Sequence, residues 1–225
     1  MKIEIWSDYA CPFCYIGEKR LMRALDDVSN KNITIEFKSF ELDPYADKKV
    51  TSTTPERFAE KYGLSLEEAK ERVEQISDMG RREGIDFRYS TTRYTNTFDA
   101  LRLTKFVQEK GHDEIITKLF DAYFTKNLEL SDHAVLKKIA VECGLDGGEV
   151  EEVLSGERYA EDVREDEKEA ASLGIHAVPY FVIGGKYGLS GAQPSEILKQ
   201  TINEALVEEN FSGMACGADG CHFDS

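Results

Sequence analysis

The sequence has little of several features that would narrow its class at once. Among its 225 residues are five prolines, one tryptophan and five cysteines. No apolar run approaches the ~18 residues that a membrane-spanning helix needs, so we expect no membrane span. Five cysteines are too few, and odd in number, for a scaffold of structural disulfides. A chain of this length is expected to fold around an ordinary hydrophobic core instead.

Positive charge is also scarce. The chain carries 28 Lys and Arg against 43 Asp and Glu, a formal net charge of −15 at pH 7. Such a surface repels phosphate backbones and anionic lipid headgroups. We therefore expect neither nucleic acid nor a membrane as a partner.

A secretory signal is a further feature that we expect to be missing. The strand-like residues 3–6 follow Met1 directly and leave no room for a charged region and an apolar region. We therefore expect a cytoplasmic location. In that compartment, an odd set of cysteines favours redox or metal chemistry.

The pattern of apolar residues predicts an α/β fold. Residues 3–6 and 33–40 are typical of strands, with helical spacing at 12–28 between them. Two further short strands, 180–183 and 186–189, are separated by Gly184-Gly185, which predicts a hairpin. The sheet should therefore be mixed, with one parallel crossover and one antiparallel hairpin.

Most of the remaining chain has helical periodicity. Thr54-Pro55 is typical of an N-cap followed by proline, and Ser65 with Glu68 has the spacing of a capping box. The last predicted helix runs from 194 to about 208 and precedes a glycine-rich tail. The other predicted helices lie at 65–83, 96–111, 113–126, 131–143, 149–154 and 158–173.

Cys11 and Cys14 stand where the first strand ends and the first helix begins. A helix N-terminus carries unpaired N–H groups and about half a positive charge, which stabilises a thiolate at Cys11. One helical turn brings Cys14 beside it, close enough for a disulfide bond. We expect Cys11 to form a mixed disulfide that Cys14 resolves. Half of a zinc knuckle, or two small buried hydrophobic residues, is the alternative.

Val178 and Pro179 precede the third strand. A proline there can simply mark a sheet edge. Beside a redox site, a cis bond would expose the Val178 backbone for pairing with an extended substrate segment. Because the cysteine pair is present, we favour this substrate-binding role; the sequence does not show whether the bond is cis.

Two motifs, WSDYACPFCYIG at 6–17 and VPYFV at 178–182, resemble the DsbA-like thioredoxin family. Two others, NTFDALRL at 96–103 and SGAQP at 190–194, resemble its FrnE-like branch more narrowly. The resemblance covers nearly the whole chain. It implies a thioredoxin-like mixed sheet with a large all-α insertion, and a site made by Cys11, Cys14 and Pro179.

The resemblance also implies a division of the chain. Residues 1–40 and 158–209 would form a discontinuous thioredoxin-like domain, residues 41–157 an inserted α-helical domain, and residues 210–225 a tail. The tail carries a second cysteine pair, Cys216 and Cys221. Some FrnE-like proteins have a similar CxxxxC, and we expect an accessory redox pair that exchanges with the first. A local disulfide, idle thiols, or a zinc site completed by His222 are the alternatives.

Other chemistry-bearing residues receive simpler interpretations. Cys143 is expected to be a buried inert thiol, and His176 needs no function. Glu4 and Glu36 are candidate proton acceptors for Cys14, although a solvated or salt-bridged carboxylate is the simpler reading. Trp6 borders the thiols. The nearby aromatic residues would supply either substrate-binding surface or core: Tyr9, Phe13, Tyr15 and Tyr180.

Together these features predict a thiol–disulfide oxidoreductase that acts on protein or low-molecular-weight thiols. We expect no bound cofactor and no metal, and keep glutathione open as a co-substrate. The alternatives are a glutathione-dependent isomerase or transferase on the same fold, whose families typically place serine at position 11, and a zinc-holding chaperone-like module. The sequence leaves the direction of exchange and the oligomeric state open.

Overall fold

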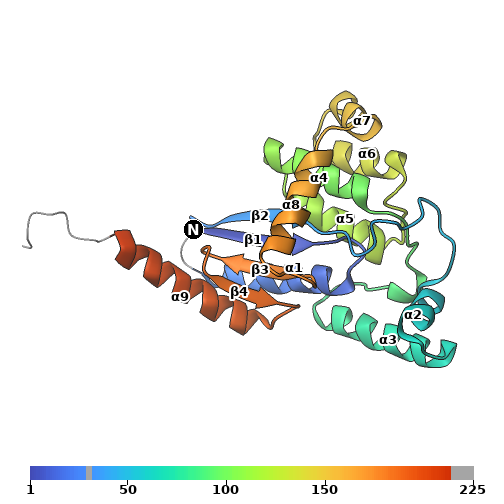
Figure 1. Cartoon of the computed structure of the whole chain (residues 1–225), viewed down its shortest axis with the longest axis horizontal. Helices are drawn as coiled ribbons and strands as arrows, with labels where there is room; N and C mark the ends of the chain where they lie inside the picture. The colour runs from blue at the N-terminus through green and yellow to red at the C-terminus, as the bar shows by residue number, and fades with distance from the viewer. Residues whose placement is uncertain (29–31, 214–225) are drawn as a thin grey trace, which may run out of the picture.

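The centre of the molecule is a mixed four-stranded sheet with helices on both faces (Figure 1). The computed structural model describes residues 1–28 and 32–213. In that part of the chain the strand order is β2-β1-β3-β4, with β1 parallel to β2 and antiparallel to β3, and β3 antiparallel to β4. The predicted combination of one parallel crossover and one hairpin is confirmed. The strands are β1 (Lys2–Ser7), β2 (Thr34–Ser39), β3 (Tyr180–Ile183) and β4 (Tyr187–Ser190).

The β3–β4 hairpin turns through two glycines. Gly184 and Gly185 have φ angles of 60° and 68°. This left-handed region suits glycine because it has no Cβ to clash with the backbone, and a two-residue turn of this kind matches the twist of paired strands. The Gly-Gly signal in the sequence thus has its expected physical cause.

The predicted helices are all present, with ends that differ by a few residues. A short 3₁₀ turn, η1 (Tyr89–Thr91), was not predicted. The helices are α1 (Pro12–Asp26), α2 (Thr54–Tyr62), α3 (Leu66–Arg82), α4 (Phe98–Lys110), α5 (Glu114–Phe124), α6 (His133–Glu142), α7 (Gly147–Ser155), α8 (Ala160–Ser172) and α9 (Ser195–Gly213).

Two helix ends show how side chains set the boundaries. The capping box of Ser65 and Glu68 at α3 is confirmed. At α2 the cap is Thr53 rather than Thr54, because Thr53 forms a capping box with Glu56 while Thr54 is already helical.

The last helix was predicted to end near residue 208, but α9 continues to residue 213. The expected tail therefore begins later, and residues 214–225 lie outside the described part of the chain.

The helices divide between the two faces of the sheet. Helices α1 and α9 lie together on one face, and α4 and α8 lie on the other (Figure 1). Asp166 of α8 fixes the second layer: its carboxylate accepts from the Ser39 backbone N–H at 2.6 Å, and its carbonyl accepts from the Trp6 indole at 3.0 Å. None of the helices in this described part is long and apolar enough to cross a membrane.

Aromatic stacking joins α1 to the helices of residues 41–157. The Tyr15 ring lies 5.2 Å from that of Phe120 and 6.0 Å from that of Phe124, centroid to centroid. Phe87 stacks on Phe124 at 4.7 Å. Such rings bury large areas and prefer these offset geometries. The aromatic core therefore runs across the predicted division at residue 41. The domain boundaries at 41 and 157 stay a prediction.

Candidate active site

The thiol pair lies in the first turn of α1, at the carboxyl end of β1. Cys11 is the N-cap residue and Pro12 occupies the first turn, where no amide hydrogen is needed. The Cys14 backbone N–H donates to the Cys11 carbonyl at 3.1 Å. Both residues are free thiols, with 4% of Cys11 and 2% of Cys14 exposed. The two cysteines therefore lie together at the helix N-terminus, as the sequence predicts.

Cys14 is the more deeply buried thiol, and its surroundings favour the protonated form. Burial raises the pKa of the Cys14 thiol well above its ordinary value, and the adjacent Cys11 raises it further. Hydrogen bonding to the Ser7 hydroxyl and to the Asp8 backbone lowers that pKa. Ser7 closes β1, so the strand end supplies a group that eases proton loss from Cys14.

The loop before β3 faces Cys11. The Val178–Pro179 peptide bond is cis, and the Cys11 thiol donates to the Val178 carbonyl across 3.5 Å. On α1, Gly17 lies so close to this loop that a Cβ added there would meet Pro179 Cγ at 3.0 Å. The four residues predicted to form the site, Cys11, Cys14, Val178 and Pro179, are thus brought together from two distant parts of the chain.

Asp8 anchors the loop that leads from β1 to Cys11. Its buried carboxylate accepts from the backbone N–H of Ala10 at 3.1 Å, the backbone N–H of Leu42 at 2.7 Å and the hydroxyl of Thr97 at 2.8 Å. Burial raises the pKa of Asp8, although these three hydrogen bonds lower it. The Asp8 carbonyl also accepts from the Cys11 N–H at 3.0 Å. Asp8 therefore ties the thiol loop to Leu42, which follows β2, and to Thr97, which precedes α4.

Sequence reasoning missed this anchoring role of Asp8. The bond from Ala10 back to the Asp8 side chain is an Asx turn, which an Asp two residues before a loop position can signal. The contact with Thr97 could not be foreseen, because it joins residues 89 positions apart. It does give the NTFDALRL motif at 96–103 a physical link to the thiol loop.

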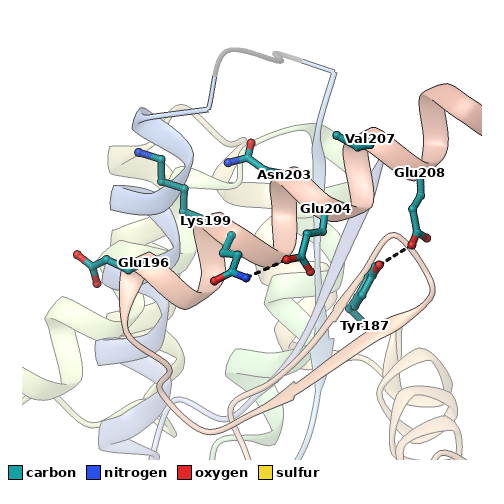
Figure 2. A pocket seen from close by; sticks show the side chains of 8 residues that line it. Tyr187, Glu196, Lys199, Asn203, Glu204, Val207 and Glu208 are labelled. Atoms are coloured by element: carbon teal, nitrogen blue, oxygen red, sulfur yellow. Dashed lines mark hydrogen bonds between the residues drawn. The ribbon is translucent and has the colours of Figure 1, made fainter.

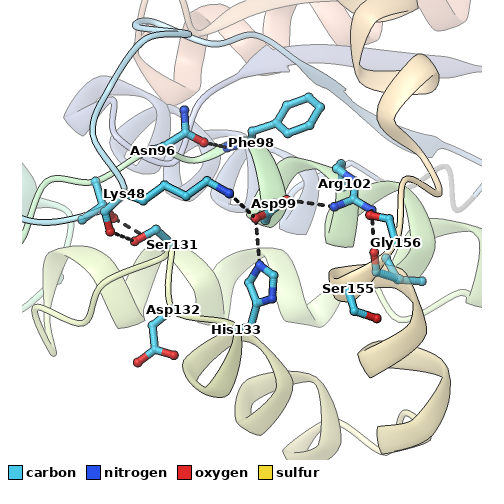
Figure 3. Close-up of polar contacts among 12 residues, drawn as sticks. Lys48, Asn96, Phe98, Asp99, Arg102, Ser131, Asp132, His133, Ser155 and Gly156 are labelled. Carbon is cyan, nitrogen blue, oxygen red and sulfur yellow. Dashed lines mark hydrogen bonds and ion pairs between the residues drawn. The ribbon is translucent and has the colours of Figure 1, made fainter.

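Two other residues of the NTFDALRL motif, Asp99 and Arg102, make structural contacts. Asp99 accepts from Arg102 and His133, each at 2.8 Å, with Lys48 at 3.5 Å (Figure 3). Burial opposes ionisation of Asp99, but the hydrogen bonds from His133 and Arg102 hold its pKa below the ordinary value. Arg102 also donates to backbone carbonyls around the end of α7, including that of Gly156 at 2.6 Å. This polar cluster joins α4, α6 and α7.

Several other candidates lie elsewhere or take a structural role. Glu4 and Glu36 both pair with Lys2, at 2.6 and 3.0 Å, in agreement with the simpler reading of these carboxylates. Cys143 is half-buried at the C-cap of α6 rather than fully buried, and it remains a free thiol. His176 is exposed.

Cys216 and Cys221 lie outside the described residues, and so does His222. Within the described residues, no group of three or more His, Cys, Asp or Glu side chains could hold a metal ion. The accessory redox role of this pair therefore stays a prediction.

The aromatic residues near the thiols divide between core and edge. Tyr9 and Tyr15 are buried, and the Tyr9 ring lies 4.8 Å from that of Phe120. Phe13 and Tyr180 are partly buried. Tyr9 and Tyr15 are therefore core residues. Phe13 and Tyr180 remain candidates for substrate-binding surface.

An open groove of about 780 Å³ lies away from the thiols, between α9 and the β3–β4 hairpin (Figure 2). Tyr187 of β4 donates a hydrogen bond of 2.7 Å to Glu208 of α9, so these two lining residues join the hairpin to the helix. Its other lining residues are Glu196, Lys199, Gln200, Asn203, Glu204 and Val207. None of the predicted site residues lines this groove.

Comparison with known proteins extends these observations over the whole chain. The family description "DSBA-like thioredoxin domain" matches residues 2–203. A probable DsbA oxidoreductase from Streptomyces coelicolor is 35% identical, with all of both chains covered and a TM-score of 0.86. A 2-hydroxychromene-2-carboxylate isomerase is 15% identical over 96% of this chain and all of its own, with a TM-score of 0.70.

A third solved structure has the same fold. The cytosolic disulfide reductase DsbM from Pseudomonas aeruginosa, solved with glutathione, is 13% identical over 95% of this chain and all of its own, with a TM-score of 0.62. At these low identities, the isomerase and DsbM share the fold with this chain and nothing more is implied. The predicted thioredoxin-like mixed sheet is confirmed. None of these three proteins carries the narrower FrnE-like name, which stays a prediction.

Proposed function

Because the chain belongs to the DSBA-like thioredoxin-domain family, we propose that it is a thiol–disulfide oxidoreductase whose active site is Cys11 and Cys14. One observation carries the proposal: both free thiols lie at the start of α1, and Cys11 contacts the loop that holds the cis Val178–Pro179 bond. The family supports disulfide exchange in general. The assignment to these residues rests on their geometry.

The exchange conserves atoms and electrons in two steps. The Cys11 thiolate attacks one sulfur of a substrate disulfide; a Cys11–substrate bond forms, and the other substrate sulfur leaves as a thiolate and takes up a proton. Cys14 then loses its proton, attacks the Cys11 sulfur and releases the second substrate thiol. The substrate gains two electrons and the protein is left with a Cys11–Cys14 disulfide. The same steps run backwards when a substrate dithiol is oxidised.

The surroundings suit the two cysteines to different steps. The amino end of α1 favours negative charge at its N-cap, which assists Cys11 as attacking and leaving group. Burial keeps Cys14 protonated, and the Ser7 hydroxyl assists its later deprotonation. Val178 offers its backbone beside Cys11 for an extended substrate.

The finer parts of the proposal concern partners and location. We propose that the protein works in the cytoplasm on protein thiols or small thiols, with no bound cofactor, and that Cys216 and Cys221 exchange with the first pair. Glutathione is a natural co-substrate to test, since the DsbM structure was solved with it. A glutathione-dependent isomerase is the second candidate, because a 2-hydroxychromene-2-carboxylate isomerase shares the fold.

Insulin reduction and refolding of scrambled ribonuclease test the assignment. We expect Cys11→Ser to lower both rates by at least ~100-fold and Cys14→Ser to accumulate the mixed disulfide, because the resolving thiol is gone. Cys143→Ser is the matched control and should change neither rate. Wild-type rates in the Cys11→Ser protein would refute the assignment. Glutathione-dependent isomerisation of a small aromatic compound that survives Cys14→Ser would favour the second candidate.

A further inference from the structure

Helix α9 ends at the opposite end of the sheet from the thiols. Glu209, in its last turns, pairs with the Met1 amino group at 3.4 Å. Gly184 donates to the Lys2 carbonyl at 2.9 Å, and a Cβ added at Gly184 would lie 3.3 Å from Ala205 Cβ. These contacts place this part of α9 beside the amino end of β1, whereas the thiols follow its carboxyl end. Figure 1 shows α9 continuing past the N-terminus of the chain, away from the sheet.

Strand and helix geometry give the size of this separation. Six residue steps of about 3.3 Å carry the chain about 20 Å from Met1 to Ser7, and Cys11 lies beyond Ser7. At the other end, α9 continues for four residues past Glu209, which adds about 6 Å in the opposite direction. Residue 213 and Cys11 are therefore at least about 26 Å apart.

The second cysteine pair is close to the end of α9 along the sequence. Cys216 is three residues after 213, and an extended chain gains at most about 3.5 Å per residue, so its Cα stays within about 10 Å of residue 213. A disulfide holds the Cα atoms of Cys216 and Cys221 about 6 Å apart, so Cys221 then stays within about 16 Å. A bond to Cys11 needs a similar spacing of about 6 Å. Neither cysteine of an oxidised pair can therefore reach the Cys11 of its own chain.

The reduced pair meets the same limit at its second step. Cys221 is eight residues after 213, so by itself it can span about 28 Å and contact Cys11. To complete the exchange, Cys216 must bond to Cys221 while Cys221 is still bonded to Cys11. Cys216 would then lie within about 12 Å of Cys11, which is farther from residue 213 than its three residues allow. Within one chain, the two pairs cannot complete an exchange while α9 is intact.

We propose that Cys216 and Cys221 of one molecule exchange with the Cys11–Cys14 pair of a second copy of this chain. The inference rests on the proposed function, in which the two pairs exchange, and it names the partner. Between two molecules the reach of the chain sets no limit, because the α9 end of one copy meets the thiol end of the other. Such a head-to-tail contact does not close on itself, and the charge of −15 on each copy favours its dissociation. The contact is therefore a transient encounter and not a stable dimer.

The exchange balances without an added reagent. One thiolate of the second pair attacks the Cys11 sulfur of the other copy; a new bond to Cys11 forms, and Cys14 leaves as a thiolate and takes up a proton. The remaining thiol of the second pair loses its proton, attacks its bonded neighbour and releases Cys11 as a thiolate. Two electrons pass from Cys216 and Cys221 of one copy to the Cys11–Cys14 disulfide of the other, which is the oxidant. The same steps run backwards from an oxidised second pair.

The first experiment mixes two complementary full-length variants. The site-thiol variant keeps Cys11 and Cys14, and the tail-thiol variant keeps Cys216 and Cys221; the other cysteines are serine, including Cys143 in both. The oxidised site-thiol variant is mixed with the reduced tail-thiol variant without oxygen, and free thiols are counted by alkylation and mass spectrometry. We expect the first to gain two thiols while the second loses two, at an initial rate that doubles when either concentration is doubled.

The ionic strength gives a second readout of the same encounter. Two molecules of charge −15 repel each other, and salt screens the repulsion. Raising the ionic strength from about 0.02 M to about 0.2 M should therefore increase the rate between the two variants at least two-fold. The reaction of the site-thiol variant with bis(2-hydroxyethyl) disulfide, which is uncharged, is the matched control and should be insensitive to salt.

The second experiment uses the wild-type chain and needs no cysteine variant to fold. Reduced protein receives one equivalent of a small disulfide, and formation of the Cys216–Cys221 disulfide is followed; the tail-thiol variant reports the part that the small disulfide oxidises directly. The remaining rate per molecule should rise about ten-fold when the protein concentration rises ten-fold. Inserting about twenty glycine and serine residues after 213 gives a span of about 25 Å, so a phase that is independent of concentration should appear.

The outcomes separate this inference from the proposed function. A site-thiol variant that reduces insulin but exchanges nothing with the tail-thiol variant overturns the inference while the function stands. A wild-type rate that does not depend on concentration also overturns it, since the exchange then occurs within one chain. Exchange between the variants without insulin reduction supports the inference and refutes protein disulfides as substrates. Neither activity refutes the proposed function, and the inference with it.

Discussion

At the scale of single residues, two buried carboxylates lie on the loop and helix that carry the thiols, Asp8 and Glu18, and burial opposes the ionisation of both. Glu18 on α1 is the clearest case. It is 2% exposed, Thr117 donates to one of its oxygens, and the other oxygen has no hydrogen-bond partner. Burial raises the pKa of Glu18 from its ordinary value of 4.5, in spite of the Thr117 hydrogen bond.

This raised pKa predicts a pH-dependent stability. Between pH 4.5 and the raised value, the folded protein binds more protons than the unfolded chain, so stability falls as pH rises through that window. Glu18→Gln removes the ionisation and should raise the free energy of unfolding by about 1 kcal/mol at pH 8. The gain should vanish near pH 4, where the carboxyl is neutral in both states. Urea denaturation at the two pH values measures it.

The control for Glu18 is Glu60→Gln, which removes the same charge from an exposed position of α2. It should leave stability unchanged at both pH values. A gain in Glu18→Gln that is equal at pH 4 and pH 8 would contradict the prediction, because a packing effect does not depend on pH whereas an ionisation effect must.

At the scale of elements, local signals succeed where the cause is local. The Ser65–Glu68 capping box and the Gly184-Gly185 turn use contacts within four residues, and both follow from the sequence. The placement of Cys11 at the start of α1 is of the same kind. The thiol pair and the order of elements could therefore be predicted from short-range patterns alone.

The sequence reveals less about hydrogen bonds between residues that are far apart along the chain. The bond between Asp8 and Thr97 spans 89 positions, and the bond between Thr117 and Glu18 spans 99. No periodicity encodes which remote polar groups pair. The extension of α9 to residue 213 was missed for a related reason, since no proline or glycine between 209 and 212 ends the helix.

The close contact between Gly80 of α3 and Phe87 predicts how a substitution changes stability. Gly80 in α3 faces Phe87, and a Cβ added at Gly80 would lie 2.5 Å from Phe87 Cδ2. Alanine is a better helix former than glycine by about 1 kcal/mol, yet the clash should dominate because Phe87 is packed among other rings. We expect Gly80→Ala to lower the free energy of unfolding by about 2 kcal/mol, measured by urea denaturation.

A double variant tests whether the loss of stability in Gly80→Ala comes from the clash with Phe87. Adding Phe87→Leu to Gly80→Ala makes room for the new methyl group. The double variant should lose less stability than the two single losses added together, because the two residues are in direct contact. Strict additivity would contradict the proposed contact.

At the scale of the whole molecule, Asp166 of α8 ties the sheet to the helices packed on it. Its carboxylate accepts from the Ser39 N–H of β2 and pairs with Lys38 of β2 and Lys105 of α4, while its carbonyl accepts from Trp6 of β1. Lys105 in turn donates to the Phe37 carbonyl. Three elements that are far apart in the sequence therefore meet at one residue of α8.

Removing that carboxylate should weaken the whole fold rather than one helix. Asp166→Ala leaves the Ser39 N–H buried without its acceptor and the Lys105 amine with only the Phe37 carbonyl, and we expect a loss of about 3 kcal/mol in the free energy of unfolding. Trp6, the only tryptophan, is fully buried against α8 and reports the transition by fluorescence. Asp162→Ala, at an exposed position one turn earlier in α8, should unfold like the wild type. Unfolding of both variants at the wild-type urea concentration would contradict the prediction. If Asp166→Ala unfolded in two steps, with Trp6 responding only in the first, Asp166 would be the contact that makes the sheet and the helices unfold as one.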